Sequence, residues 1–295
     1  MTLQGIILVF FSALTHASWN VYSKSFGNPL SFMYAALVWS AVIYVPLFAA
    51  ALAFAPYTPV VWALVLCSGL LCSVYFLALA FAYQDGLVSV AYPVARAFPI
   101  LVVTWAGILL GERPSPLGML GILLVVTGCF FLPFREFRRS DDGTPFWRAY
   151  FTRSAFWAFV TALVTSVYSI VDKLAAVRIT AASPGLAMLG KLNYVYLQNL
   201  ISLAALAVLI RLLRLKVEPV PGRPAAIFGV IFLVSYGLIM LALATDSVAY
   251  VVSFRHLSIV IATVASMAFM EKFFSWPRFV GALQITLGVV LVGLS

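Results

Sequence analysis

Of the 295 residues, 64% are hydrophobic and 9% are charged, whereas an ordinary soluble domain carries roughly 25% charged residues. Such a chain cannot hide its apolar surface from water, which excludes a soluble enzyme or binding domain. The net charge of +9 does not indicate a nucleic-acid partner, because the basic residues lie mainly in loops beside helix ends, as in membrane proteins. We therefore expect a multi-pass protein of the cell (inner) membrane, in contact with the lipid bilayer.

Apolar stretches of about 20 residues, long enough to span a bilayer, recur along the chain. They predict an all-α integral membrane protein with ten transmembrane helices. The breaks between the stretches carry loop-forming residues, for example Ser183-Pro184-Gly185. The predicted helices cover residues 3–24, 31–54, 60–83, 87–110, 116–133, 154–173, 186–210, 225–244, 248–270 and 277–294.

An internal repeat relates the two halves of the chain. The sequence of residues 89–92 recurs identically at 247–250, and an arginine follows each copy, Arg96 or Arg255. Because each half has an odd number of crossings, the second half enters the membrane from the opposite side, so the five-helix repeats are inverted. The predicted units are a first repeat at 1–134, a connecting loop at 135–153 and a second repeat at 154–295.

Inverted repeats place a binding site near the membrane midplane, and one half can rock against the other to give alternating access. The alternative is a duplicated scaffold without transport activity. Three cysteines lie in apolar runs without the spacing of metal ligands, so we expect neither a metal nor a cofactor.

Polar residues form a stripe along one face of the first and sixth predicted helices. A polar stripe that faced lipid would leave its groups without hydrogen bonds, so both stripes should face the protein interior or a water-filled cavity. Hydrogen bonding between helices is the simpler explanation for the serines and threonines, whereas for His16 we favour the cavity. The stripes contain Ser12, His16, Trp19, Asn20 and Ser23 in one helix and Thr161, Thr165, Tyr168, Ser169 and Asp172 in the other.

Arg96 and Arg255 each lie roughly two turns into a predicted helix. Each follows a tyrosine, Tyr92 or Tyr250, at a spacing that lets ring and guanidinium lie together. A guanidinium fork matches the two oxygens of a carboxylate or phosphate. The alternative is that each arginine snorkels to the membrane interface or neutralises a carboxylate at a helix end.

The predicted helix bounds place all nine acidic residues in loops or near helix ends, Asp172 among them. We therefore expect no carboxylate at the midplane to carry a coupling proton. His16 then remains as the deep group that titrates near neutral pH. Facilitated diffusion needs no such group and stays open.

The stretches 16–20, 92–96 and 111–113, together with the five-plus-five repeat, resemble the ten-helix EamA-like family of the drug/metabolite transporter superfamily. The resemblance implies a secondary carrier with a central cavity lined mainly by helices one, three, four, six, eight and nine. It also implies cytoplasmic termini, whereas the loop charges favour the reverse, so the orientation stays open. The first helix carries His16 and no acid, unlike that of the four-helix multidrug-cation relatives, which disfavours that activity.

We thus expect a transporter, not an enzyme, that moves a small organic metabolite. A metabolite that bears a carboxylate or phosphate would suit the arginines. A lipid or headgroup flippase is the alternative, and an intramembrane transferase with His16 as base has less support. Monomer and homodimer are both open. The candidate substrate-binding residues are His16, Trp19, Asn20, Tyr92, Arg96, Tyr168, Ser169, Tyr250 and Arg255.

Overall fold

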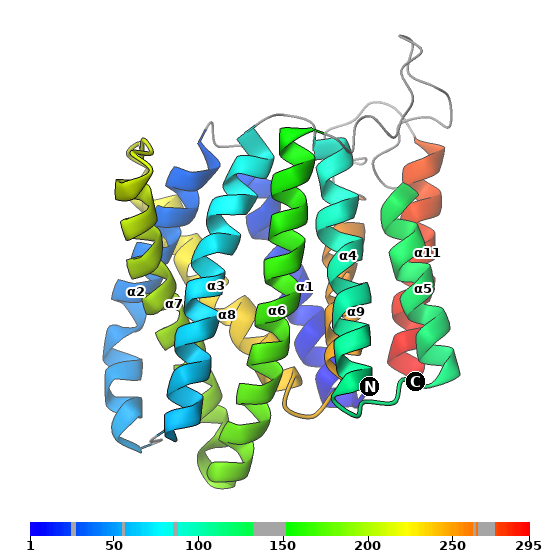
Figure 1. The fold of residues 1–295 in the computed structure, drawn as a ribbon, viewed down its shortest axis with the longest axis horizontal. Helices are drawn as coiled ribbons and strands as arrows, with labels where there is room; N and C mark the ends of the chain where they lie inside the picture. Colours follow the sequence, from blue (N-terminus) through cyan, green and yellow to red (C-terminus); the bar gives the residue numbers. More distant parts are fainter. Residues whose placement is uncertain (25–27, 55–56, 85–87, 132–151, 262–263, 265–274) are drawn as a thin grey trace.

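A computed structural model gives the fold as upright helices packed side by side (Figure 1). Among the residues it describes, all regular secondary structure is helical. The described residues are 1–24, 28–54, 57–84, 88–131, 152–261, 264 and 275–295, and for 19–24, 47–54, 84 and 88–96 the backbone alone is described.

Proline opens several helices of the first half. Pro29, Pro59 and Pro116 each occupy the first helical position, where the missing N–H costs no hydrogen bond and the fixed φ suits a helix. These starts match the predicted helices within two residues. The helices are α1 (Leu3–Lys24), α2 (Pro29–Phe54), α3 (Pro59–Gln84), α4 (Val88–Leu109) and α5 (Pro116–Phe131).

The second half begins after the connecting segment. The predicted helix over 248–270 is described continuously as far as Ile261 and is interrupted by a turn at His256; most of its later part lies outside the described residues. The elements are α6 (Arg153–Ala182), the short 3-10 helix η2 (Pro184–Leu186), α7 (Ala187–Leu212), α8 (Gly222–Ala242), α9 (Val248–Arg255) and α11 (Trp276–Leu294).

Six helices within the described ranges are long and apolar enough to cross a membrane by length and composition. They are α2, α3, α6, α7, α8 and α11. Shorter apolar helices add to these, at Leu3–Ser18, Ala97–Leu109, Pro116–Phe131 and Val248–Ile261. Large apolar side chains remain exposed on nearly every helix, as expected where lipid rather than water surrounds the protein.

Helix α6 is longer than the sequence predicts. The prediction ends it at residue 173, but the chain continues through small and apolar helix formers to Ala182. The helix ends before Pro184, since the residue preceding a proline avoids helical geometry. Asp172 therefore lies inside the helix and not at its end, which corrects the expectation that no acidic residue lies deep in the bundle.

Helices α5 and α11 form a close pair at one edge of the bundle (Figure 1). Gly121 of α5 lies against Gly288 of α11, and Gly128 lies against Gly281, so the two helices run antiparallel. A Cβ on Gly128 would stand 2.7 Å from the carbonyl oxygen of Gly281. Glycine is thus required for the backbones to approach this closely.

Gly128→Ala is expected to destabilise the protein by about 1–3 kcal/mol, because the added methyl group forces two backbones apart. The thermal unfolding midpoint in detergent micelles measures the effect. Gly185→Ala is the matched control, since a Cβ there meets no atom within 4 Å. Equal midpoints for the two variants would contradict the close packing of α5 on α11.

The remaining helices enclose the centre of the molecule. Helix α3 packs against α6 and α7, while α1 packs against α8 and α9. In Figure 1, α3, α6 and α4 stand in front and α1, α8 and α9 stand behind them. Residues that face inward from these two groups of helices can therefore meet in the middle of the bundle.

Candidate functional site

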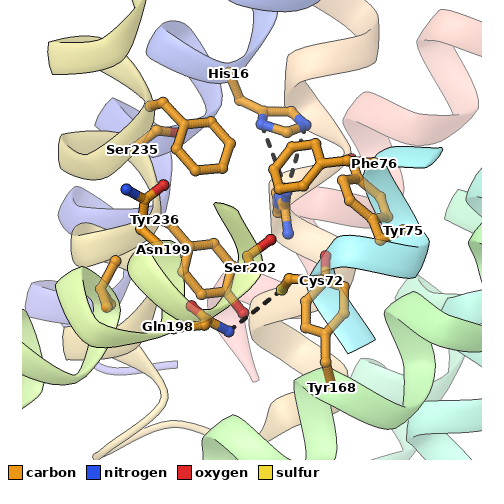
Figure 2. Close-up of a pocket in the computed structure, with 13 residues that line it drawn as sticks. His16, Cys72, Tyr75, Phe76, Tyr168, Gln198, Asn199, Ser202, Ser235 and Tyr236 are labelled. Atoms are coloured by element: carbon orange, nitrogen blue, oxygen red, sulfur yellow. Dashed lines mark hydrogen bonds between the residues drawn. The ribbon is translucent and has the colours of Figure 1, made fainter. Parts of the chain in front are cut away.

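A cavity with an empty volume of about 530 Å³ lies between six helices, α1, α3, α6, α7, α8 and α9. Figure 2 shows its lining side chains converging from opposite sides. The lining residues are His16, Cys72, Tyr75, Phe76, Tyr168, Val195, Gln198, Asn199, Ser202, Phe232, Ser235, Tyr236 and Arg255.

Five aromatic rings form most of the apolar wall of the cavity. The ring of Tyr168 contacts that of Tyr75 edge to face at a centroid distance of 5.8 Å and that of Tyr236 at 6.1 Å. Phe76 and Phe232 lie 5.3 Å apart. Such edge contacts hold each ring against its neighbours, so the wall is preformed and offers ring faces and edges to a ligand.

Arg255 brings a positive charge to this aromatic cavity. It is the last residue of α9, and its guanidinium carbon lies 5.9 Å from the ring centroid of Tyr236. Its Nη2 lies 3.4 Å from Nε2 and 3.5 Å from Nδ1 of His16 (Figure 2). A guanidinium can only donate, so a ring nitrogen of His16 that bonds to it does so as an acceptor.

The charge of Arg255 lacks a carboxylate partner within the described residues. Its buried Nε also has no hydrogen-bond partner there. A cation without a carboxylate partner is costly in a membrane protein. Two more lining residues carry buried atoms without a partner in the described part of the chain, Oδ1 of Asn199 and Oγ of Ser202. The cavity therefore holds unused hydrogen-bonding capacity beside a positive charge.

Behind the cavity wall, the fully buried carboxylate of Asp172 is the centre of a hydrogen-bond cluster. Oδ1 accepts from the hydroxyls of Ser68 at 2.6 Å and Tyr194 at 2.9 Å. Oδ2 accepts from the hydroxyl of Tyr236 and from Nε2 of Gln198 at 3.2 Å. Four neutral donors from three other helices thus meet one carboxylate, which we call the Asp172 cluster.

The Asp172 cluster and the cavity share residues. Tyr236 and Gln198 line the cavity with one part of the side chain and donate to Asp172 with another. Gln198 also donates to Ser68 at 2.5 Å and reaches the sulfur of Cys72 at 3.4 Å (Figure 2). A single side chain therefore separates the carboxylate of Asp172 from the cavity.

A second polar cluster joins the helices at the end of the bundle where both termini lie (Figure 1). Nζ of Lys173 donates to the backbone oxygen of Asp246 at 2.6 Å and lies 3.8 Å from Oε1 of Glu112. Glu112 also accepts from Oγ of Ser247 at 2.5 Å and from the backbone N of Val248 at 3.1 Å. A carboxylate thus caps the start of α9, where the helix dipole favours negative charge.

Three of the predicted site residues, His16, Tyr168 and Arg255, lie together in the cavity wall. Ser169 lies outside it, with its Oγ bonded to the backbone oxygen of Thr165 at 2.7 Å. Bonds of this type satisfy all three serine and threonine hydroxyls of the α6 stripe within their own helix. The side chains of Trp19, Asn20, Tyr92 and Arg96 lie outside the described residues.

Tyr250 lies away from Arg255, contrary to the predicted proximity of the two. A spacing of five residues turns a helix by about 140° beyond one full turn, so the side chains leave α9 on different sides. The hydroxyl of Tyr250 accepts from the backbone N of Ser115 at 2.8 Å, and its ring packs against Gly118. The ring under the guanidinium is that of Tyr236 from α8.

The α7 and α8 residues of the site were not predicted from the sequence. Gln198, Asn199 and Ser202 stand at i, i+1 and i+4 in α7, and this spacing is the signal that could have indicated them. On α8, Ser235 and Tyr236 are the corresponding polar positions. Ser235 holds α8 to α1, since its backbone oxygen accepts from Oγ of Ser12 at 2.7 Å.

Comparison with known proteins finds a family match over part of the chain and a similar fold. Residues 3–133 match the model of the EamA-like transporter family. A solved structure, described only as the crystal structure of a protein, is similar over 100% of this chain and 98% of that chain, with a TM-score of 0.72 and 18% sequence identity. At this identity the likeness concerns the fold alone. No curated protein sequence matches the chain.

Proposed function

We propose that this chain is a multi-pass membrane transporter that moves a small organic anion. The match of residues 3–133 to the EamA-like transporter family supports a transporter of small molecules. The observation that carries the proposal is the charge of Arg255 in an aromatic cavity, without a carboxylate partner in the described residues. The transport is secondary and proceeds across the cell (inner) membrane by alternating access.

The chemistry of the cavity indicates the class of substrate. A carboxylate or phosphate supplies the oxygens that the guanidinium of Arg255 lacks, while its body lies between the aromatic rings. Asn199 and Ser202 offer further hydrogen bonds to a polar group on that body. A flat or aromatic organic acid fits these requirements, whereas an inorganic anion would leave the aromatic wall unused.

The packing of α5 on α11 supports the inverted repeat behind alternating access. The glycines that meet, Gly121 with Gly288 and Gly128 with Gly281, are related by exchanging the two helices. A twofold axis between antiparallel helices produces this pattern, and it is the relation that an inverted repeat requires. The cavity lies between residues of both halves, so rocking of one half on the other would open it to either side.

Ligand-dependent thermal unfolding of the purified protein tests the substrate class. We expect phenylpyruvate and phenyl phosphate to raise the unfolding midpoint by on the order of 5 °C at about 100 times Kd. Benzyl alcohol and benzyltrimethylammonium, which carry the ring without a negative charge, are expected to leave it unchanged. Stabilisation by the cation and not by the anions would overturn an anion site at Arg255.

A further inference from the structure

The carboxylate of Asp172 has no part in holding the anion, yet its position in α6 is unusual. The residue lies about 29 Å from the start of the helix and about 15 Å from its end, at 1.5 Å per residue. Its exposed fraction is 0%. An acidic side chain at such depth is costly and is a mark of function in membrane proteins.

The four partners of Asp172 are neutral donors, and within the described residues no cation lies at ion-pair distance from it. Four donors fill the lone pairs of an ionised carboxylate. Three of the donors are hydroxyl groups, and a hydroxyl can accept as well as donate. The same cluster can therefore hold the carboxyl group with or without a proton.

We propose that Asp172 is the binding site of a co-transported proton and that the chain is a proton–anion symporter, an inference that rests on the proposed function. The geometry that carries it is the double role of Tyr236, which donates to Oδ2 of Asp172 and also lies under the guanidinium of Arg255 in the cavity wall.

The proton reaches Oδ2 of Asp172 through the hydroxyl oxygen of Tyr236. A hydronium ion in the cavity gives a proton to the hydroxyl oxygen of Tyr236, which passes its own proton to Oδ2 of Asp172, and water remains. Asp172 is then a neutral acid that donates to Tyr236, whose hydroxyl hydrogen turns toward the cavity. Release to the other side reverses these steps, with no other bond made or broken.

Charge balance gives the direction of the coupling. Ionised Asp172 and Arg255 sum to zero, so an anion alone leaves the buried site with a net charge of −1. A proton on Asp172 returns the loaded site to neutrality, which favours binding and movement of the pair through an apolar environment. Anion and proton therefore bind cooperatively, and each raises the affinity of the other by the same factor.

Other titratable or charged groups near Asp172 come from α3, α6, α7, α8 and α9. Cys72 lies on α3, Tyr194 on α7, Tyr236 on α8 and Arg255 on α9, with Tyr168 and Lys173 on α6 itself. The described side chains of α4, from Ala97 to Leu109, include no charged group. Asp172 is the acidic member of this set, so Asp172→Asn removes the carboxylate while leaving the others in place.

The experiment uses phenylpyruvate, an acid that stays ionised over the pH range tested, with the full-length protein. For the wild type, Kd is expected to fall as the pH is lowered, with a slope approaching tenfold per pH unit, the value for one proton taken up per anion. In Asp172→Asn the Kd should be independent of pH, because the amide is always neutral. Glu218→Gln, which changes an exposed loop carboxylate, should behave as wild type.

Proteoliposomes separate coupling from transport. Wild type is expected to accumulate phenylpyruvate when an inward proton gradient is imposed, and a pyranine-loaded lumen should acidify. Asp172→Asn should lose accumulation at least tenfold yet retain exchange of labelled for unlabelled phenylpyruvate at equal pH. Gradient-driven accumulation by Asp172→Asn, or accumulation driven by sodium instead of protons, would overturn the proposal.

If the proposed function itself is wrong, the wild type will show neither binding nor exchange of phenylpyruvate at any pH. This result differs from a failure of proton coupling alone. Tyr236→Phe provides a second variant that retains the ring under Arg255 and the carboxylate itself. It is expected to bind phenylpyruvate and to reduce proton-driven accumulation, since the link between Asp172 and the cavity is removed. Full accumulation by Tyr236→Phe would also count against the proposal.

Discussion

Arg255→Gln is expected to lower the initial rate of phenylpyruvate uptake into proteoliposomes at least about 30-fold. The glutamine keeps hydrogen-bonding capacity but removes the positive charge beside His16 that would pair with the bound anion. Loss of one partner of such a charge pair costs about 2 kcal/mol or more, and 1.4 kcal/mol corresponds to a factor of ten. The loss should appear in the Kd for the anion, because the proposed role of the guanidinium is to bind it.

Two further variants separate charge from geometry and from folding. Arg255→Lys retains the charge without the planar fork and is expected to restore part of the uptake. Arg178→Gln removes an arginine that is exposed on α6 and lies outside the cavity, and it should transport as wild type. Normal uptake by Arg255→Gln in correctly inserted protein would remove Arg255 from the site.

Asp172→Ala is expected to lower the free energy of unfolding by about 3 kcal/mol or more. The substitution leaves four buried donors, on Ser68, Tyr194, Gln198 and Tyr236, without their shared acceptor, and each unsatisfied buried donor costs about 1–3 kcal/mol. Hydroxyl groups that turn to other acceptors recover part of this. Unfolding of the protein by SDS in mixed micelles measures the difference.

Ser68→Ala removes one donor and leaves the carboxylate in place, so its effect should be much smaller, about 1 kcal/mol. Glu218→Ala in the exposed loop should have no measurable effect. If Asp172→Ala were as stable as Ser68→Ala, the Asp172 cluster would not hold α3, α6, α7 and α8 together.

Much of the helical order could be predicted from the sequence because hydropathy alone marks a spanning helix. Proline and glycine mark its ends, and the predicted start of α5 at residue 116 is the observed one. The polar stripe on α1 likewise placed His16 inward, and the match of a guanidinium to a carboxylate or phosphate singled out Arg255 as a binding residue. Both arguments need only one helix at a time.

The rest of the site depends on contacts between helices, which the sequence pattern of a single helix does not predict. Asp172 could not be recognised as a deep residue because the predicted helix ended at Lys173, and a lysine in the last turn is typical of a helix end. Its role becomes visible only when Ser68, Tyr194 and Tyr236 arrive from three other helices. The pairing of Arg255 with the ring of Tyr236 is of the same kind, since sequence spacing had favoured Tyr250.

An anion that binds at Arg255 and is carried by alternating access should show counterflow. Proteoliposomes are loaded with unlabelled phenylpyruvate and diluted into a trace of the labelled anion at equal pH. Wild type is expected to accumulate label transiently above equilibrium, and Arg255→Gln is expected to accumulate none. Equal counterflow by both proteins, or influx that rises linearly with concentration without saturation, would contradict this mechanism.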